Sequence, residues 1–128
     1  DLPNLAHCCP AKASSAKSPS RAAGFAVDGR RDTRWTSIYL DDQWLAVDLG
    51  KTCKVARVDI KWEAACAARY ELQASLDGER WSTLATERGR EGWVVTELPE
   101  EAPARWVRMY GRQRATKFGF SIWAFCVY

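Results

Sequence analysis

Residues 111–128 read Gly111-Arg-Gln-Arg-Ala-Thr-Lys-Phe-Gly-Phe-Ser-Ile-Trp-Ala-Phe-Cys-Val-Tyr128. From Ile122 onward the chain is an almost unbroken apolar run, rich in aromatic residues and bounded upstream by Gly119. Such a run predicts a strand that is buried on both faces. The arginines and rings that precede it therefore form a loop mounted on the core.

This loop has the residue types of a binding surface. Binding residues usually lie on loops that a rigid scaffold holds in place. Aromatic rings beside Arg and Thr donors suit a sugar, because a sugar ring has an apolar face and a rim of hydroxyl groups. The simpler alternative is a well-packed terminal strand preceded by a solvated turn.

Length and composition limit the possible classes. The 128 residues predict one domain, long enough to form a core without stapling. The chain has seven tryptophans and one histidine, and most of the tryptophans should lie in the core because they are costly to expose. A formal net charge of +3 does not by itself indicate nucleic-acid binding, which usually needs a concentrated basic face. No apolar run approaches the ~20 residues of a membrane span.

The rest of the chain predicts short strands. Apolar and polar residues alternate over residues 43–49, 54–62, 70–75, 81–86, 92–97 and 105–110. The N-terminal residues are rich in Ser, Ala, Lys and Pro, and they predict an irregular lead-in over residues 1–12. No window has a sustained helical period. Short strands between turn signals predict an all-β sandwich or barrel, formed by residues 1–128 as a single domain.

Alternating strand directions sort the loops between the two ends of such a sandwich. One end should carry the loops at residues 36–42, 63–69, 87–91 and 111–121. The opposite end should carry the loops at residues 50–53, 77–80 and 98–104, together with the C-terminus.

The cysteines indicate a disulfide-clamped, secreted domain. Cys53 and Cys66 lie at opposite ends of a strand that spans roughly 30 Å at ~3.3 Å per residue, too far for a disulfide. If the N-terminal segment packs beside the C-terminal strand, Cys8 and Cys9 can pair with Cys53 and Cys126 in either order, which leaves Cys66 unpaired. Free cysteines in a cytosolic protein are the alternative.

An ordered set of motifs covers nearly the whole chain. The motifs are Ala13-Ser-Ser15, Ala26-Val-Asp-Gly29, Thr33-Arg-Trp35, Gln43-Trp-Leu-Ala-Val-Asp-Leu-Gly50, Val58-Asp-Ile-Lys-Trp-Glu63, Tyr70-Glu-Leu-Gln73, Ser75-Leu-Asp-Gly78, Ala104-Arg-Trp-Val-Arg108, Arg114-Ala-Thr116 and Phe118-Gly-Phe-Ser-Ile-Trp123. Together they resemble the discoidin domain, also called the coagulation factor 5/8 C-type domain. The closest variety is the bacterial carbohydrate-binding module of family 32.

This resemblance implies a fold and a function. The expected fold is a galactose-binding-like β-sandwich of jelly-roll type. The expected function is that of a non-catalytic, lectin-like module that attaches a secreted enzyme or adhesin to a polysaccharide. Galactosides, β-glucans and amino-sugar polymers all remain possible ligands, and a catalytic domain in the same polypeptide is a possible partner. The expected location is extracellular or on the cell surface.

The resemblance also implies a ligand site on the loops at one end. Its residues are Arg34, Tyr39, Glu63, Arg112, Arg114, Phe118 and Phe120. Arginines can donate paired hydrogen bonds to hydroxyls or a carboxylate, a glutamate can accept from hydroxyls or pair with an amino sugar, and rings can stack. A salt bridge between Glu63 and Arg114 that braces the loops is the alternative. Trp35, Trp62 and Trp123 are assigned to the core.

A structural calcium ion is implied in the loop that contains Asp28. Its ligands would be Asp28, Thr33 and the backbone carbonyl of Arg30, a mixed oxygen set of the kind that calcium prefers. The sequence departs from the family pattern at Ala124, where a glutamate is expected. Arg30 and Arg31 also place positive charge beside the loop. The alternative is a loop held by its own Asx hydrogen bonds.

Other functions are less well supported. The only histidine, His7, lies in the irregular lead-in with no nucleophile visibly paired to it, so the sequence does not predict an enzyme. A discoidin domain that binds membrane phospholipid or a protein through the same loops is the alternative function, because a basic loop with exposed rings can enter an anionic membrane. Nucleic acid is not expected, since acidic residues are interleaved along the chain.

Overall fold

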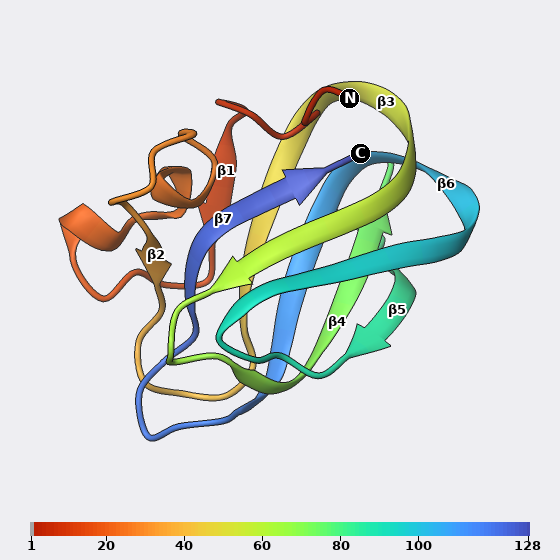
Figure 1. Ribbon diagram of the computed structural model, residues 1–128. Coiled ribbons are helices and arrows are strands. Elements are labelled where there is room, and N and C mark those ends of the chain that lie inside the picture. Colours follow the sequence, from red (N-terminus) through yellow and green to blue (C-terminus); the bar gives the residue numbers. More distant parts are fainter. Residues whose placement is uncertain (1) are drawn as a thin grey trace.

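The computed structural model describes residues 2–128, and β-strands dominate it (Figure 1). The strands are β1 (Ala11–Ala13), β2 (Trp35–Thr36), β3 (Gln43–Trp62), β4 (Ala67–Ser75), β5 (Ser82–Glu87), β6 (Gly92–Arg114) and β7 (Ser121–Val127). Two short 3-10 helices, η1 (Pro19–Arg21) and η2 (Ala23–Ala26), lie between β1 and β2. Within residues 2–128, no helix has the length and apolar character needed to cross a membrane.

The strands pair in the order β2-β7-β3-β6-β4-β5, and β1 also pairs with β3; every pairing is antiparallel. The long strands β3 and β6 bend as a pair, with register shifts between Asp48 and Cys53 and between Val55 and Arg57. Figure 1 shows the result as two layers, with β7 and one half each of β3 and β6 in front of β1, β4, β5 and the other halves.

The predicted all-β sandwich is therefore confirmed, but its strand boundaries were wrong in two places. The predicted strands at 43–49 and 54–62 are the two halves of β3, and those at 92–97 and 105–110 are the two halves of β6. The turn at Gly50 does not end β3, because its pairing with β6 resumes at Cys53 opposite Ala104. The lead-in was also drawn too long, since β1 begins at Ala11.

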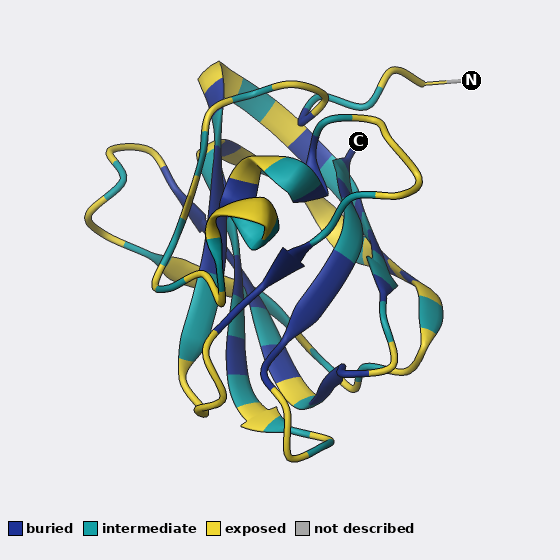
Figure 2. Ribbon diagram, turned by 90° about the vertical axis from the view of Figure 1, so that its left-hand side faces the viewer, coloured by how far each residue is buried: buried dark blue, intermediate teal, exposed yellow. Residues whose placement is uncertain are grey.

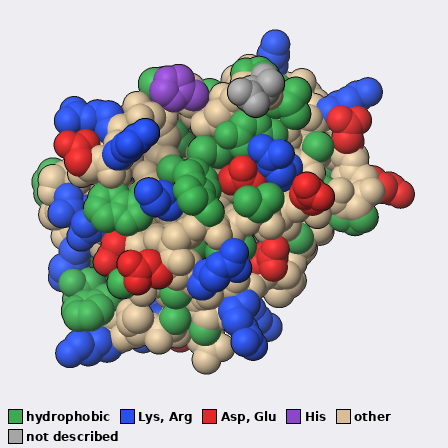
Figure 3. All heavy atoms as spheres, viewed as in Figure 1, with side chains coloured by type: hydrophobic (Ala, Val, Ile, Leu, Met, Phe, Trp, Pro, Cys, Tyr) green, Lys and Arg blue, Asp and Glu red, His purple; other side chains and the backbone are tan. Residues whose placement is uncertain are grey.

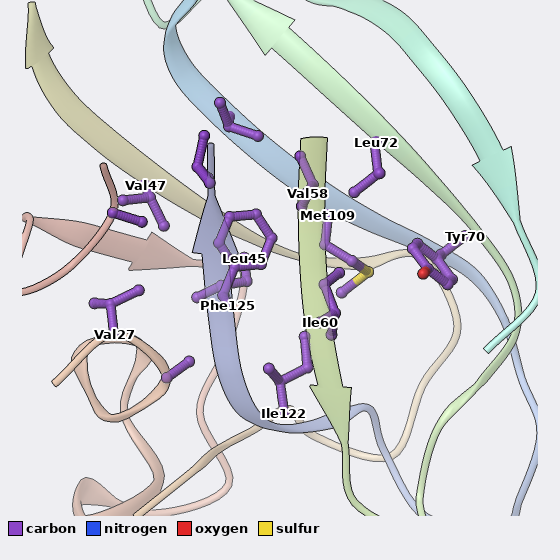
Figure 4. Packing of buried hydrophobic residues seen from close by; sticks show 14 of the residues in the cluster. Val27, Leu45, Val47, Val58, Ile60, Tyr70, Leu72, Met109, Ile122 and Phe125 are labelled. Carbon is purple, nitrogen blue, oxygen red and sulfur yellow. The ribbon is translucent and has the colours of Figure 1, made fainter. Parts of the chain in front are cut away.

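The core lies between the two layers (Figures 2 and 4). Alternate residues of each strand point into it, as the period of a strand requires. The residues of the strands that are fully or almost fully buried in this alternation include Leu45, Val47, Val58, Ile60, Trp62, Tyr70, Leu72, Ala74, Val107 and Met109. Figure 4 shows several of these side chains gathered in one cluster that also includes Ile122 and Phe125 of β7.

β7 differs from its prediction. Ile122, Phe125 and Val127 are buried, whereas Trp123 and Cys126 are only partly buried, so the strand is covered on one face rather than two. The register of β7 against β3 shifts between Lys61, opposite Ala124, and Trp62, opposite Ile122. Trp123 is the extra residue at this bulge, and a bulge re-aims side chains. The assignment of Trp123 to the core was therefore wrong, while Trp35 and Trp62 are buried as predicted.

The cysteines are all free thiols. The N-terminal segment does lie beside β7, because the Leu5 amide donates to the Val127 carbonyl at 2.8 Å. Even so, the Sγ atom of Cys9 lies 3.2 Å from the Leu5 carbonyl oxygen and that of Cys53 lies 3.5 Å from the Lys51 carbonyl oxygen. Cys126 lies opposite Asp59 in β3. The predicted disulfides among Cys8, Cys9, Cys53 and Cys126 are thus not formed in this structure.

Phe120 joins the core to the loops at one end. Its ring is 0% exposed and lies against Gly111, where an added Cβ would come within 2.5 to 2.7 Å of three ring carbons. Its backbone amide donates to Ser37 Oγ at 2.9 Å, and the Ser37 amide donates to the Phe120 carbonyl at 2.9 Å. The 36–42 and 111–121 loops are therefore held together over a buried ring.

Replacing Phe120 by alanine should destabilise the domain. Removing a fully buried ring leaves a cavity, which typically lowers the free energy of unfolding by about 3–5 kcal/mol. The matched control is Phe118→Ala, because the Phe118 ring is 45% exposed and an exposed substitution usually costs less than about 1 kcal/mol. Urea unfolding of both variants measures the difference, and equal losses would contradict the packing role of Phe120.

Candidate functional site

Three loops meet at one end of the sandwich around a hollow of about 350 Å³. The hollow is lined by Arg34, Thr36, Tyr39, Glu63, Ala64, Ala65, Thr116, Phe118 and Ser121. Most of these residues lie in the loops at 36–42, 63–69 and 111–121, which the sequence assigned to this end, and Arg34 lies just before the first of them. Four of the seven predicted site residues, Arg34, Tyr39, Glu63 and Phe118, therefore lie together.

Hydroxyl groups and backbone bonds fix the floor of the hollow. The hydroxyls of Thr36 and Ser121 lie 2.9 Å apart and both residues are buried. The Glu63 amide donates to the Ser121 carbonyl, and the Ser121 amide donates to the Ala65 carbonyl, each at 2.9 Å. The sequence analysis did not assign these floor residues to the site, although Ser121 lies within the motif Phe118-Gly-Phe-Ser-Ile-Trp123, because small side chains such as these are common in loops.

Tyr39 and Phe118 form an aromatic wall. Their ring centroids are 5.6 Å apart with the planes at 82°, an edge-to-face arrangement. The residues are 41% and 45% exposed, so the rings remain available to a ligand. Lys17 Nζ lies 4.3 Å from the centroid of the Tyr39 ring, and Lys117 Nζ lies 5.4 Å from that of Phe118. The wall is therefore apolar with a cationic edge.

Arg34 and Glu63 are the two charged residues that line the hollow. Among residues 2–128, neither of them lies within 4.0 Å of an oppositely charged group. Arg34 Nε donates weakly to Thr36 Oγ1 at 3.4 Å, and the guanidinium lies 5.0 Å from the centroid of the Trp123 ring. Glu63 Oε1 accepts from the Ala65 amide at 3.2 Å. Both side chains keep hydrogen-bonding capacity for a ligand.

Arg114 braces the loops instead of lining the hollow. Its Nε and its backbone amide both donate to Asp41 Oδ1 at 2.9 Å, and Nη1 donates to the Tyr39 carbonyl at 2.8 Å. The Arg114 amide and guanidinium lower the pKa of the Asp41 carboxyl group. The suggested salt bridge between Glu63 and Arg114 is wrong, since Arg114 pairs with Asp41.

Arg112 also lies outside the residues that line the hollow. Its Nε donates to Glu71 Oε2 at 2.8 Å, and Nη1 donates to Asp42 Oδ1 at 3.4 Å. Phe120 lies beneath the hollow, and its predicted role as a stacking ring is wrong because no part of it reaches the surface. The seven predicted site residues therefore divide into four that line the hollow and three that support it.

The loop that contains Asp28 is closed by its own hydrogen bonds. Thr33 Oγ1 lies 2.9 and 2.7 Å from the two Asp28 carboxylate oxygens, and the Arg30 amide donates to Asp28 Oδ1 at 3.0 Å. Ala124 supplies no second carboxylate, and residues 2–128 contain no group of three acidic, His or Cys side chains arranged to hold a metal ion. These residues fit calcium poorly, because calcium favours several oxygen ligands with negative charge.

Chelation should therefore leave the stability of the domain unchanged. Thermal unfolding in EDTA and in millimolar calcium should give the same Tm, because hydrogen bonds within the loop take the place of metal ligands. Asp28→Ala, which removes those bonds, should lower Tm equally in both buffers. A Tm that falls by several degrees only on chelation would restore the calcium prediction.

Acid should weaken the pair between Glu71 and Arg112. Hydrogen bonds from Arg112, Gln73 and Thr83 lower the pKa of Glu71 from its ordinary value of 4.5 to about 2. As pH falls from 4.5 towards 2 the unfolded chain gains this proton first, so the free energy of unfolding should decrease over that window. In Glu71→Gln the decrease should be smaller. Urea unfolding of the wild type and of Glu71→Gln at pH 5, about 3.5 and about 2.5 measures the two decreases. Equal decreases in the two proteins would contradict the prediction.

Comparisons with known proteins agree with this architecture. The family model for the F5/8 type C domain matches residues 10–125. The crystal structure of chitosan-binding module 1 from a Paenibacillus sp. IK-5 chitosanase/glucanase has a TM-score of 0.94 and 38% identity, and covers 99% of each chain. Module 2 of the same enzyme, solved in complex with chitotriose, has a TM-score of 0.94 and 34% identity over 98% of this chain and 99% of its own.

Two further matches are a structure of lower sequence identity and a relative that is similar over part of this chain. The family 32 carbohydrate-binding module of Clostridium perfringens NanJ, solved with galactose, has a TM-score of 0.82 over 92% of this chain and 91% of its own, at 23% identity. The polysaccharide lyase 8 family protein HylA of Enterococcus faecalis is 34% identical over 80 residues, which are 62% of this chain and 6% of that protein. The galactose-binding-like β-sandwich expected from the motifs is confirmed, and the chain belongs to the F5/8 type C domain family.

Proposed function

We propose that this chain is a carbohydrate-binding module that holds a larger protein on a polysaccharide or oligosaccharide. The hollow at the loop end combines an aromatic wall with an arginine and a glutamate that have no ion-pair partner among residues 2–128. A sugar can place its apolar face on the rings while its hydroxyls donate to the carboxylate and accept from the guanidinium. The availability of Arg34 and Glu63 is the observation that carries this proposal.

The relatives favour a glycan ligand without identifying it. Two similar structures come from chitosan-binding modules, one of them holding chitotriose. In this chain Glu63 can accept from sugar hydroxyls or pair with the ammonium group of an amino sugar, and Arg34 can donate to hydroxyls. Galactosides, β-glucans and amino-sugar polymers therefore all stay within the proposal. The hollow is shallow, so a small sugar should bind with a Kd on the order of millimolar to micromolar.

The proposed role is attachment and not catalysis. The chain spans only 6% of the length of the lyase-family relative HylA, and its chitosan-binding relatives derive from a chitosanase/glucanase. A module of this kind would bring an extracellular or cell-surface enzyme or adhesin to its polysaccharide. Secretion, and a catalytic domain in the same polypeptide, belong to this proposal.

Substitution of Arg34 or Glu63 should weaken binding without unfolding the domain. A panel of chitosan, β-1,4-glucan and galactose oligosaccharides is titrated by calorimetry against the wild type, Arg34→Ala and Glu63→Gln. We expect at least one oligosaccharide to bind, and each variant to bind it at least about tenfold more weakly, a loss typical of one charge-assisted hydrogen bond. The control is Lys51→Ala, an exposed residue in the turn at the opposite end of the sandwich.

Two results would count against the proposal. Wild-type affinity in both folded variants would remove the site assignment, and no binding to any oligosaccharide would remove the carbohydrate function.

A membrane surface is the second candidate, favoured by one observation. Ile38, Tyr39, Leu40 and Phe118 are all at least 38% exposed at this end, and Lys17 and Lys117 lie beside two of their rings. Exposed apolar side chains with basic neighbours can enter an anionic bilayer. Sedimentation with phosphatidylserine vesicles, abolished by Leu40→Ser and by salt in a protein that binds no oligosaccharide, would favour this candidate over the first.

A further inference from the structure

A second hollow, of about 480 Å³, lies beside the loop site on a different surface. Its floor is the outer face of the front layer in Figure 1, where Lys61 of β3 lies opposite Trp93 of β6 and Ala124 of β7. Loop residues 26–31 form one wall. No part of the proposed loop site uses these residues.

The bulge in β7 creates this hollow. It turns Trp123 outward, so that the indole lines the hollow instead of the core. The neighbouring floor residue, Ala124, has only a methyl group, which leaves the space above it open. Trp93 stands on the other side of Lys61 and is 46% exposed. The indole rings of Trp93 and Trp123 thus form walls of the hollow, and Lys61 and Ala124 lie on the floor between them.

The charge of the hollow is entirely positive. Arg30, Arg31 and Lys61 line it, and its lining contains no acidic residue. Arg30 is paired with Asp32 at 3.3 Å, but Arg31 and Lys61 have no carboxylate within 4.0 Å among residues 2–128. Figure 3 shows Lys and Arg side chains along the left-hand part of this face, beside large hydrophobic side chains. Unpaired cations next to aromatic walls suit a ligand with an anionic group and an apolar face.

The two hollows adjoin where the guanidinium of Arg34 lies over the indole ring of Trp123. Arg34 lines the loop site, and its guanidinium lies 5.0 Å from the centroid of the Trp123 ring, which lines the second hollow. A ligand that fills the loop site can therefore continue past Arg34 onto Trp123 without leaving the surface. An oligosaccharide is such a ligand, because its units repeat the same stacking and hydrogen-bonding groups.

We infer that this hollow is a second saccharide subsite, which takes an acidic sugar unit of a glycan whose neighbouring units occupy the loop site. The anionic group, a carboxylate or a sulfate, lies against Lys61 and Arg31, and the sugar rings stack on Trp93 and Trp123. The inference rests on the proposed carbohydrate function of the loop site. It adds a preference for acidic glycans and a dependence on chain length.

The test compares tetrasaccharides that differ in charge at about 0.15 M salt, where long-range attraction is screened. The three probes are a galacturonate tetrasaccharide, a chondroitin sulfate tetrasaccharide and cellotetraose. Calorimetry measures the binding of each probe to the wild type and to an Arg31→Gln, Lys61→Gln double variant. The control is a Lys51→Gln, Lys54→Gln double variant, which makes the same change in charge at exposed residues of the opposite end. Trp93→Ala tests stacking separately, and circular dichroism checks that every variant is folded.

We expect an acidic tetrasaccharide to bind more tightly than cellotetraose. The Arg31→Gln, Lys61→Gln variant and Trp93→Ala should each weaken that binding about tenfold, with the control unchanged and any binding of cellotetraose unaffected. Binding of the galacturonate probe would show that a carboxylate is sufficient, whereas binding of the chondroitin sulfate probe alone, which carries both groups, would point to the sulfate. Arg34→Ala should weaken the acidic and the neutral probes together, because it belongs to the loop site.

The other outcomes separate this inference from the proposed function. Acidic probes that bind the wild type and the Arg31→Gln, Lys61→Gln variant equally would overturn the subsite, and so would equal losses in the control variant. Binding only of neutral or amino-sugar oligosaccharides would overturn the inference and leave the carbohydrate function standing. Failure of every oligosaccharide to bind the folded wild type would remove both.

Discussion

The antiparallel pairing of β3 with β6 is the interaction on which the rest of the structure depends. It extends from Gln43 opposite Gly111 to Trp62 opposite Gly92, and register shifts near Gly50 let the pair bend without ending. Both strands therefore take part in both layers. Because the same backbone hydrogen bonds hold the two layers, neither can slide over the other, and the loops at one end keep a fixed spacing. A shallow binding site needs that rigidity, since ordering mobile loops on binding would weaken affinity.

Charge pairing then decides which side chains support the loops and which face a ligand. Asp41 is held by Arg114, and Arg112 is held by Glu71 with a longer contact to Asp42. These pairs tie the 36–42 loop to β6 and β4. They also occupy guanidinium donors of Arg112 and Arg114, which the sequence analysis had assigned to the ligand site. Within the part of the chain that the structure describes, Arg34 and Glu63 remain without ion-pair partners in the hollow between the loops. A charged side chain is most useful to a ligand where the fold has not already neutralised it.

One irregularity in β7 extends this surface. The bulge opposite Lys61 and Trp62 turns Trp123 out of the core and places it between the two hollows, under the guanidinium of Arg34. Ala124 leaves space where the family pattern has a glutamate, and the neighbouring Asp28 loop is closed by Thr33 and Arg30. The absence of a carboxylate at Ala124 thus accompanies an open, positively charged surface on the front layer.

The sequence by itself determined the all-β class, the alternation that buries Leu45, Val58 and Leu72, and the gathering of Arg34, Tyr39, Glu63 and Phe118 at one end. These follow from local periodicity, turn residues and ordered motifs, which act over a few positions. Tertiary structure alone decided that Phe120 is a core ring, that Trp123 is not, and that Arg112 and Arg114 are braces. Each of those outcomes depends on a partner distant in the chain, such as Asp41 for Arg114 or Gly111 for Phe120, or on a one-residue bulge that reverses which face a side chain occupies.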